Sequence, residues 1–216
     1  MKVYLAVGHG RRTNGTVDPG ATLGSATEQN QGAPIVAAAA KRLRDRGVTV
    51  KAQRAGDPNF IGYTAEANEW GADLAISVHH DWHKAPRGAF GFWHPSSPEG
   101  KRLADNIYVS VSAAGFPMRP SWHRPHGSLH FLNNTRMPAV LWECDRVGSV
   151  KDHARYGRAL ADGILEYLDI QEDDVDLTPV EKKWLEDFVK QSRGRDVKPD
   201  SLGYIVSAWR KIRELW

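Results

Sequence analysis

The sequence is poor in cysteine, and this limits the chemistry that its side chains offer. Among 216 residues there is one cysteine, Cys144. A single cysteine cannot close an intramolecular disulfide, and it excludes a zinc site built from several thiolates. Any protein-bound metal must therefore be held by histidine and carboxylate side chains. No spacing pairs Cys144 with a base, so we expect a buried, unreactive thiol and not a nucleophile.

The sequence also lacks a long apolar run. A membrane-spanning helix needs about 18 or more consecutive apolar residues, and no stretch of the chain approaches that length. The first ten residues lack the apolar segment and the small-residue cleavage site of a secretory signal peptide. We therefore expect no membrane insertion, and synthesis in the cytoplasm without a signal peptide.

Charge of one sign is not in large excess. The chain has 29 lysines and arginines against 26 aspartates and glutamates, a formal net charge of +3, and no long basic run. Nucleic-acid-binding proteins usually carry a basic patch or a basic helix, so we do not expect nucleic acid as the partner. The small positive excess favours an anionic partner. With 41% hydrophobic and 25% charged residues, the composition is that of an ordered globular protein.

Apolar runs alternate with helical patterns from residue 3 to residue 168. Short apolar runs predict strands, and periodic segments that close on glycine predict helices. The predicted strands are Val3 to Val7, Val48 to Gln53, Leu74 to Val78, Ala89 to Trp93, Ser128 to Leu132 and Pro138 to Trp142. The predicted helices are Ile35 to Leu43, Thr64 to Trp70, Gly100 to Ala114 and Asp152 to Leu168. This order indicates an α/β domain, with a mostly parallel or mixed twisted sheet and helices on both faces.

A different kind of segment follows this domain. Residues 171 to 177 are acidic and predict a linker, and two apolar stripes beyond them, Val180 to Val189 and Leu202 to Trp216, predict a helical hairpin. We therefore divide the chain into a catalytic domain, 1 to 170, and a linker with a C-terminal helical hairpin, 171 to 216. The pattern leaves open whether the hairpin binds the cell wall, docks on the catalytic domain or mediates dimerisation.

Three residues whose side chains can bind a metal or transfer protons lie at the ends of predicted strands. His9, His79 and Glu143 each follow a separate strand. Ligands of open α/β sheets bind outside the carboxyl ends of the strands, so we expect these side chains at one edge of the sheet. Glu28 lies at the start of the first helix, where the preceding loop of about twenty residues can return it to the same edge.

Two histidines and one glutamate are a common ligand set for catalytic zinc, which keeps a fourth position open for water. His9, Glu28 and His79 provide that set. Each also has a structural interpretation. Ser25 to Glu28 has the spacing of a helix capping box, His9 suits a glycine-flanked turn, and His79 suits a hydrogen-bonded core position. Taken one by one, the residues leave both interpretations open.

Several short motifs occur in order along residues 1 to 168. They are Val7-Gly8-His9-Gly10, Asp18-Pro19-Gly20-Ala21, Thr27-Glu28, Gln53-Arg54 with Asp57, Ala67-Asn68 with Gly71-Ala72-Asp73, Ser77-Val78-His79, and Thr135 to Glu143. In this order and spacing the sequence resembles the zinc-dependent N-acetylmuramoyl-L-alanine amidases of bacterial autolysins and phage endolysins. Two segments depart from the family's pattern. His80-Asp81 stands where a small residue and asparagine are usual, and Cys144-Asp145-Arg146 where Thr-Gly-Phe is common.

The resemblance implies an enzyme that uses zinc-activated water to hydrolyse the amide bond between the muramic acid lactyl group and the first L-alanine of peptidoglycan. It implies His9, Glu28 and His79 as zinc ligands. It implies Glu143 as the catalytic carboxylate, which takes a proton from water and returns it to the leaving amine. The departure at His80 leaves open whether His79 or His80 is the ligand. Apart from the resemblance, an ion pair with a nearby base such as Arg146 explains Glu143 equally well.

Three further residues are candidates for substrate binding. Aromatic faces suit packing against a glycan, which makes Trp93 one of them. His126 suits contact with a developing oxyanion. Arg54 belongs to the Gln53-Arg54 segment of the resemblance.

We expect a bacteriolytic endolysin whose partner is peptidoglycan and which reaches the cell wall after holin-type release. The alternatives are a zinc peptidase or carboxypeptidase with the same ligand set, and a non-catalytic peptidoglycan-binding protein on an amidase scaffold. Retention of all three ligands and of Glu143 argues against the binding protein. The ligand types alone permit other metals, and the sequence leaves open the oligomeric state, the host and the peptidoglycan chemotype.

Overall fold

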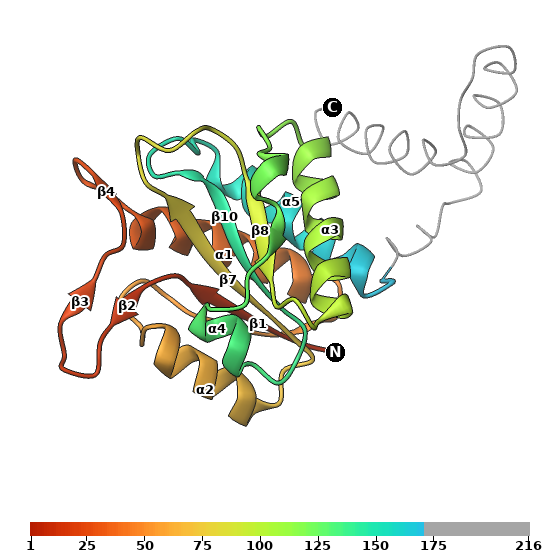
Figure 1. The fold of residues 1–216 in the computed structure, drawn as a ribbon. Coiled ribbons are helices and arrows are strands. Elements are labelled where there is room, and N and C mark those ends of the chain that lie inside the picture. Colours follow the sequence, from red (N-terminus) through yellow and green to blue (C-terminus); the bar gives the residue numbers. More distant parts are fainter. Residues whose placement is uncertain (171–216) are drawn as a thin grey trace, which may run out of the picture. The chain divides into compact units, whose positions relative to one another are not determined.

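The computed structural model describes residues 1–170 of the chain. Its centre is a six-stranded sheet in which the strands follow the order β6-β1-β7-β10-β8-β9 (Figure 1). These strands are β1 (Lys2–Val7), β6 (Thr49–Ala52), β7 (Leu74–Asp81), β8 (Phe90–Trp93), β9 (Arg124–Pro125) and β10 (Ala139–Arg146). The first four in sheet order are parallel, and β8 runs antiparallel to β10. The predicted mixed, mostly parallel sheet is confirmed.

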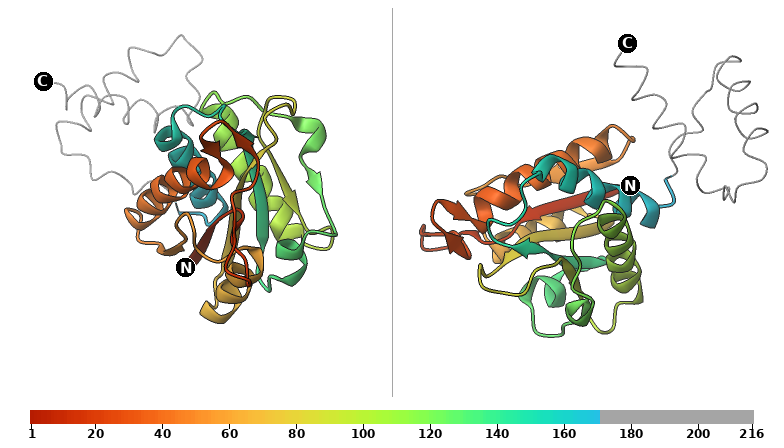
Figure 2. Two further views of the ribbon diagram at one scale, coloured as in Figure 1. Left: turned by 90° about the vertical axis from the view of Figure 1, so that its left-hand side faces the viewer. Right: turned by 90° about the horizontal axis from the view of Figure 1, so that it is seen from above.

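Helices cover both faces of this sheet, as predicted. They are α1 (Glu28–Arg44), α2 (Phe60–Trp70), α3 (Pro98–Ala113), α4 (His130–Asn134) and α5 (His153–Tyr167). α1, α3 and α5 lie on one face, and α2 and α4 lie on the other (Figures 1 and 2). A crossover helix must pack on the sheet that its strands form, and this explains why β1 is buried from Val3 to Val7.

Alternation along the strands separates the side chains of the two faces. Tyr4, Leu141 and Phe90 point to the α2 and α4 face, where they form a core with Tyr63 of α2 and Phe131 of α4. The residues between them point to the α1, α3 and α5 face. The two-sided core therefore fixes which side chain of each strand faces which layer.

The loop between β1 and α1 folds into two small hairpins beside the carboxyl edge of the sheet (Figure 1). Their strands are β2 (Gly10–Arg11) with β3 (Val17–Asp18), and β4 (Thr22–Leu23) with β5 (Ala26–Thr27). The first hairpin carries Asp18 and the second ends directly before Glu28. This loop therefore returns the start of α1 to the edge where β1 ends.

Two of the predicted local structures are wrong. Ser128 to Leu132 is not a strand, because residues from His130 onward form α4; a short apolar run fits either structure. The capping box is not Ser25 to Glu28. Thr27 caps α1, its side chain accepts a hydrogen bond from the backbone of Asn30, and the Asn30 side chain accepts one from Thr27. The Glu28 carboxylate is therefore not used for capping.

Strand ends differ from the prediction in a way that affects the site. β7 continues to Asp81 and β10 continues to Arg146, so His79 and Glu143 lie within strands and not after them. His9 follows β1 as predicted. The predicted hairpin between residues 171 and 216 lies outside the described residues. Within 1–170, no helix is both long and apolar enough to cross a membrane.

Candidate metal centre

Three elements bring His9, Glu28 and His79 together at the carboxyl edge of the sheet. His9 follows β1 and has a positive φ of 67°, an uncommon conformation for a residue other than glycine. His79 belongs to the neighbouring strand β7, and Glu28 is the first residue of α1. One donor atom from each residue lies within 4.8 Å of the other two. The structure thus assembles the three residues that the sequence assigned to a metal.

The Glu28 carboxylate lies between the two imidazoles. His9 Nε2 is 3.1 Å from Glu28 Oε1, and His79 Nδ1 is 3.3 Å from Glu28 Oε2. Two backbone N–H groups fix the carboxylate, because Ala21 donates to Oε1 and His80 donates to Oε2. Glu28 is 6% exposed. A buried carboxylate in this position needs cationic partners, either protons on the histidines or a metal ion.

A second layer of polar groups sets the proton on each imidazole. His9 Nδ1 is 3.4 Å from Asp18 Oδ1, and His79 Nε2 is 3.0 Å from Ser77 Oγ, which is itself 2.8 Å from the Tyr63 hydroxyl. Protons donated to Asp18 and to Ser77 leave the other ring nitrogens, His9 Nε2 and His79 Nδ1, with lone pairs toward the same point. Metal-bound histidines in proteins show this arrangement.

Two glycines make room for the ligands. A Cβ atom on Gly8 would lie 2.5 Å from the His79 ring, and one on Gly20 would lie 2.5 Å from the His9 ring and 2.8 Å from Glu28. Real side chains do not tolerate such approaches. The glycines at these positions are therefore required by the packing of the imidazoles.

The charges of the cluster favour a cation at its centre. Burial lowers the pKa of His9, but the Glu28 and Asp18 carboxylates outweigh burial and raise it overall. Burial raises the pKa of Glu28, but the hydrogen bonds and charges of His79 and His9 hold it far below its usual value. The same negative potential attracts a divalent cation. The donor set, two neutral imidazoles and one carboxylate, is a ligand set of catalytic zinc, so the residues present fit zinc.

Glu143 lies beside this cluster on the next strand. It is the register partner of His79 in the parallel pair of β7 and β10, so both side chains leave the same face of the sheet. Glu143 Oε2 is buried and has no hydrogen-bond partner among residues 1–170. Burial, followed by the negative charges of Glu28 and Asp81, raises the pKa of Glu143 well above its usual value, against the opposing charge of Arg119. Arg146 bonds to Ser149 and not to Glu143, so the ion pair between them is excluded.

The sequence matches one protein family along most of this domain. The profile of the family described as N-acetylmuramoyl-L-alanine amidase covers residues 3–161, a range that includes His9, Glu28, His79 and Glu143. The chain belongs to this family. It is therefore an amidase that acts on peptidoglycan, and the family is zinc-dependent. A search of curated proteins finds no match.

Several solved structures share this fold. The amidase is similar to Ami1 from Mycobacterium smegmatis, with a TM-score of 0.68, 21% identity, and coverage of 79% of this chain and 98% of that one. It is similar to the catalytic domain of CwlV from Bacillus (Paenibacillus) polymyxa var. colistinus, with a TM-score of 0.65, 22% identity, and coverage of 79% of this chain and 99% of that one. It is also similar to the catalytic domain of the CD27L endolysin, with a TM-score of 0.62, 19% identity, and coverage of 77% of this chain and 97% of that one.

The adjacent His80 lies on the opposite face of the amidase sheet. Its ring is 1% exposed, and neither ring nitrogen has a partner within the described residues. Burial lowers the pKa of His80 to about 4, so the ring is neutral at pH 7. Only its backbone N–H reaches the metal cluster, through Glu28. The geometry thus brings His79, and not His80, to His9 and Glu28.

The three predicted substrate-binding residues lie at different distances from the cluster. Trp93 pairs with Val140, is 6% exposed and packs on the α3 face under Lys101, so its ring is on the other side of the sheet from Glu143. The His126 ring packs 5.1 Å from that of Phe92, which is on the Glu143 face. Arg54 follows β6 at the carboxyl edge and is exposed. His126 and Arg54 stay predictions with suitable positions.

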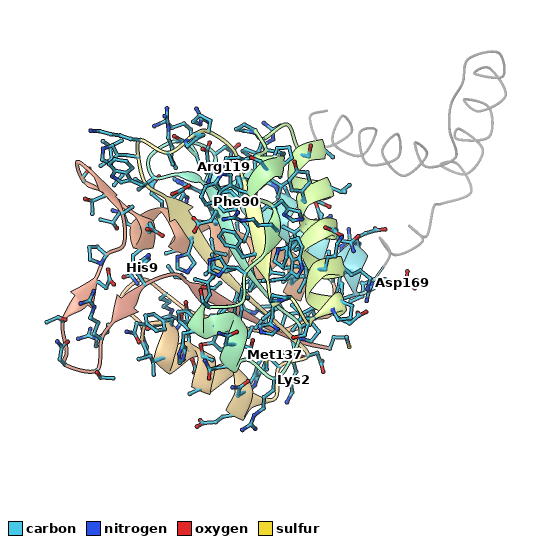
Figure 3. All side chains as sticks on the ribbon, in the orientation of Figure 1. Lys2, His9, Phe90, Arg119, Met137 and Asp169 are labelled. Carbon is cyan, nitrogen blue, oxygen red and sulfur yellow. The ribbon has the colours of Figure 1, made fainter. Side chains whose placement is uncertain are left out.

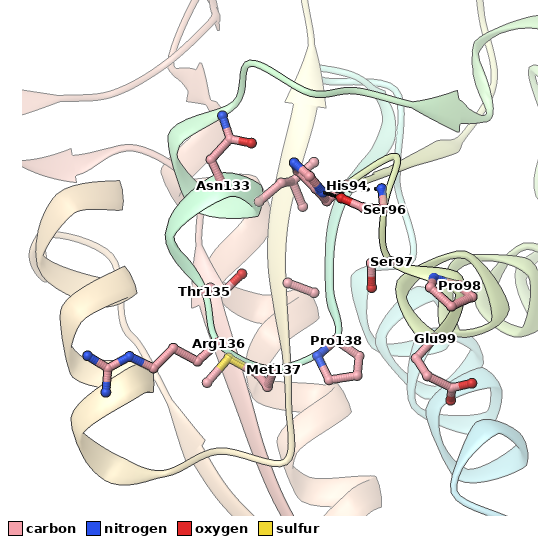
Figure 4. Close-up of a pocket in the computed structure, with 12 residues that line it drawn as sticks. His94, Ser96, Ser97, Pro98, Glu99, Asn133, Thr135, Arg136, Met137 and Pro138 are labelled. Atoms are coloured by element: carbon pink, nitrogen blue, oxygen red, sulfur yellow. Dashed lines mark hydrogen bonds between the residues drawn. The ribbon is translucent and has the colours of Figure 1, made fainter.

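A cavity of about 390 Å³ lies away from the metal cluster. Figure 4 shows it at the start of β10, where His94, Asn133 and Met137 line it. In Figure 3, Met137 and His9 lie at opposite ends of the sheet. Because His9, Glu28, His79 and Glu143 are at the carboxyl edge, this cavity is not part of the catalytic site.

Sequence reasoning missed the two residues that orient the imidazoles, Asp18 and Ser77. Asp18 was visible as part of the Asp18 to Ala21 motif, but no role followed from its position in a loop. Ser77 is two residues before His79 on a strand, and this spacing places both on one face. That alternation was the available signal for Ser77.

Proposed function

We propose that residues 1 to 170 are the catalytic domain of an amidase in which His9, Glu28 and His79 hold one zinc ion and Glu143 transfers protons. The bond hydrolysed is the amide between the lactyl group and L-alanine. When bound, zinc lowers the pKa of water and polarises a carbonyl group. Side chains of the protein carry out the proton transfers.

The buried, unpartnered Oε2 atom of Glu143 is the observation that supports its role best. A buried polar atom without a partner is costly in a folded protein, and such costs concentrate at functional sites. A raised pKa suits a general base, because a carboxylate with a higher pKa accepts a proton more readily. Glu143 takes the proton of the attacking water and then donates it to the leaving amine of L-alanine.

The second layer of the site supports zinc ligation by His79 and not His80. Ser77 and Asp18 hold the two imidazoles with their lone pairs inward. The backbone N–H groups of Ala21 and His80 hold Glu28. A ligand set positioned in this way loses little conformational freedom on binding a metal.

The test of this proposal is the Glu143→Gln variant, which keeps the shape of the side chain and removes its base. We expect the rate of muropeptide cleavage to fall by about 10²- to 10⁴-fold while one zinc ion per chain is retained. Glu66→Gln on α2 is the control, and it should cleave at the wild-type rate. A Glu143→Gln variant that is as active as the wild type would show that another group transfers the proton.

We further propose that the enzyme is a phage endolysin that reaches the wall after holin-type release. The similar fold of the CD27L endolysin catalytic domain supports this role. Expression inside bacteria tests it. We expect lysis only after the inner membrane is permeabilised, and lysis without permeabilisation would contradict holin-type release.

A further inference from the structure

Beside the catalytic edge, an aromatic ring carries two guanidinium groups. The Trp122 ring has Arg119 Cζ 5.0 Å and Arg124 Cζ 4.7 Å from its centroid. These distances are typical of cation–π contacts. Trp122 is itself 43% exposed. The feature therefore combines an exposed aromatic ring with guanidinium groups that contact it.

The sheet register places this feature on the same face as Glu143, with Arg124 level with Leu141, two residues before Glu143 on β10, because Arg124 pairs with Phe92 and Phe92 pairs with Leu141. Glu143 pairs with Phe90 on β8, and the Phe90 ring lies 5.9 Å from the Trp122 ring and 4.2 Å from Arg119 Cζ. Figure 3 shows Phe90 and Arg119 close together over the same part of the sheet. Two strand spacings of roughly 4.8 Å separate β10 from β9, and two residues of roughly 3.4 Å separate Leu141 from Glu143, so the backbone of Arg124 lies roughly 12 Å from that of Glu143.

The residue between Trp122 and Arg124 anchors both of them. His123 accepts a hydrogen bond from the Gly91 N–H at Nδ1, and its Nε2 is 3.0 Å from Asp105 Oδ1. Its ring packs against Tyr108 of α3, on the opposite face of the sheet. Arg124 is the parallel register partner of Phe92, so its side chain leaves the sheet on the Glu143 face, and the contact with Phe90 places the Trp122 ring on that face too.

The two arginines differ in how their charge is used. Arg119 is 7% exposed and forms an ion pair with Asp81, so its charge is neutralised within the protein. Arg124 is exposed, and no carboxylate of residues 1–170 forms an ion pair with it. Arg124 is therefore a positioned guanidinium, with its planar donors available to an anion. Guanidinium groups bind carboxylates through paired hydrogen bonds.

We propose that Arg124, held by Trp122, binds a free carboxylate of the peptidoglycan stem peptide and makes the enzyme prefer stems that carry it. The proposal rests on the proposed function. An extended peptide spans about 3.3–3.6 Å per residue, so the separation of roughly 12 Å between Glu143 and Arg124 corresponds to about three stem residues. Carboxyl groups of the second and third stem residues fall in this range. The interaction discriminates them from their amidated forms.

The test compares two N-acetylmuramyl tripeptides that differ only in whether the carboxyl groups of the second and third residues are free or amidated. We expect the wild type to cleave the free form with a kcat/KM about fivefold to tenfold higher, the range of a partly exposed charge-assisted hydrogen bond. Arg124→Gln should remove this preference through KM and leave kcat unchanged, because the contact is distant from the reacting atoms. Trp122→Phe should retain the preference and Trp122→Leu should reduce it.

Arg136→Gln is the matched control, since Arg136 is an exposed arginine beside the cavity at the start of β10, away from the metal cluster. Loss of the preference in Arg136→Gln and not in Arg124→Gln would overturn the proposal. Equal cleavage of both substrates by the wild type would also overturn it and leave the proposed function intact. Cleavage of neither substrate by zinc-loaded wild type would overturn both.

Discussion

Glu143 and His79 are register partners on the parallel strands β10 and β7, and their side chains project from the same face of the sheet. This pairing places a carboxylate whose Oε2 atom has no hydrogen-bond partner within the described residues next to an imidazole that faces Glu28. It also separates the functions of the two. His79 belongs to the cluster of possible ligands, whereas Glu143 is outside that cluster and lies beside it on the neighbouring strand.

Replacing Gly8 by alanine should disrupt the metal site without touching a ligand. The added Cβ would lie 2.5 Å from the His79 ring, so the ring must move away from Glu28. We expect zinc affinity to fall by about tenfold or more, by analogy with the loss of a group that orients a ligand. Chelator competition measures this. Gly32→Ala is the control, because its nearest contact would be 3.5 Å; equal zinc affinity of Gly8→Ala and wild type would contradict the packing argument.

Alanine variants of the two adjacent histidines separate their functions. His79→Ala should purify with far less than one zinc per chain, because Nδ1 is one of the three donors. His80→Ala should keep its zinc, because the His80 ring lies on the other face of the sheet. We expect His80→Ala to lower the free energy of unfolding by about 2–4 kcal/mol, because it empties a buried site. Metal analysis and thermal unfolding distinguish the two, and the reverse pattern would assign the ligand to His80.

Asp18→Asn should weaken zinc binding without abolishing it. The Asp18 carboxylate faces His9 Nδ1 at 3.4 Å, and its charge favours a proton there and so a lone pair on Nε2. Removing an orienting carboxylate typically lowers metal affinity by about 10- to 100-fold. Asp45→Asn, at an exposed ion pair with Lys41, is the control. If both variants bind zinc as tightly as the wild type, Asp18 has no role in orienting His9.

Glu143→Gln should stabilise the metal-free protein at neutral pH. Because burial and the charges of Glu28 and Asp81 raise the pKa of Glu143 in the folded state, its ionised form lowers the free energy of unfolding. This destabilisation reaches its full size above the pKa that Glu143 has in the folded state, and it vanishes below the pKa that Glu143 has in the unfolded state. We therefore expect the variant's gain in Tm, about 2–4 °C for each kcal/mol in a chain of this size, to shrink as the pH falls toward 4.5.

Glu66→Gln should change Tm at pH 7 in the opposite direction, and it serves as the control. Burial raises the pKa of Glu66, but the hydrogen bonds from Lys51 and Tyr4 outweigh burial and lower it overall. Its ionised form thus stabilises the fold above the unfolded pKa, and this contribution is lost as the pH falls. Glu66→Gln should be less stable than the wild type at pH 7 and equal to it in acid. If Glu143→Gln and Glu66→Gln shift Tm in the same direction at pH 7, the opposite pKa shifts assigned to these two carboxylates are contradicted.

Hydrophobic alternation and glycine positions were enough to predict the α/β class and the sheet edge. The spacing of Ser25 and Glu28 is that of a capping box, so the sequence pattern alone favoured a capping role for Glu28. The family resemblance was needed to choose the role of metal ligand instead. Strand lengths were not predictable at His79 and Glu143, where β7 and β10 continue through polar residues because neighbouring strands still pair with them. The prediction of a strand from Ser128 to Leu132 was wrong because so short a segment carries no clear period, and α4 begins within it at His130.

The central claim is that one zinc at His9, Glu28 and His79, together with Glu143, hydrolyses the lactyl amide of peptidoglycan. The most direct test counts new L-alanine amino termini released from purified peptidoglycan by wild-type protein, chelated protein and chelated protein with one equivalent of zinc restored. The account predicts release by the wild type, loss after chelation and recovery with zinc. Release that persists after complete removal of zinc, or new amino termini of any other residue, would contradict it.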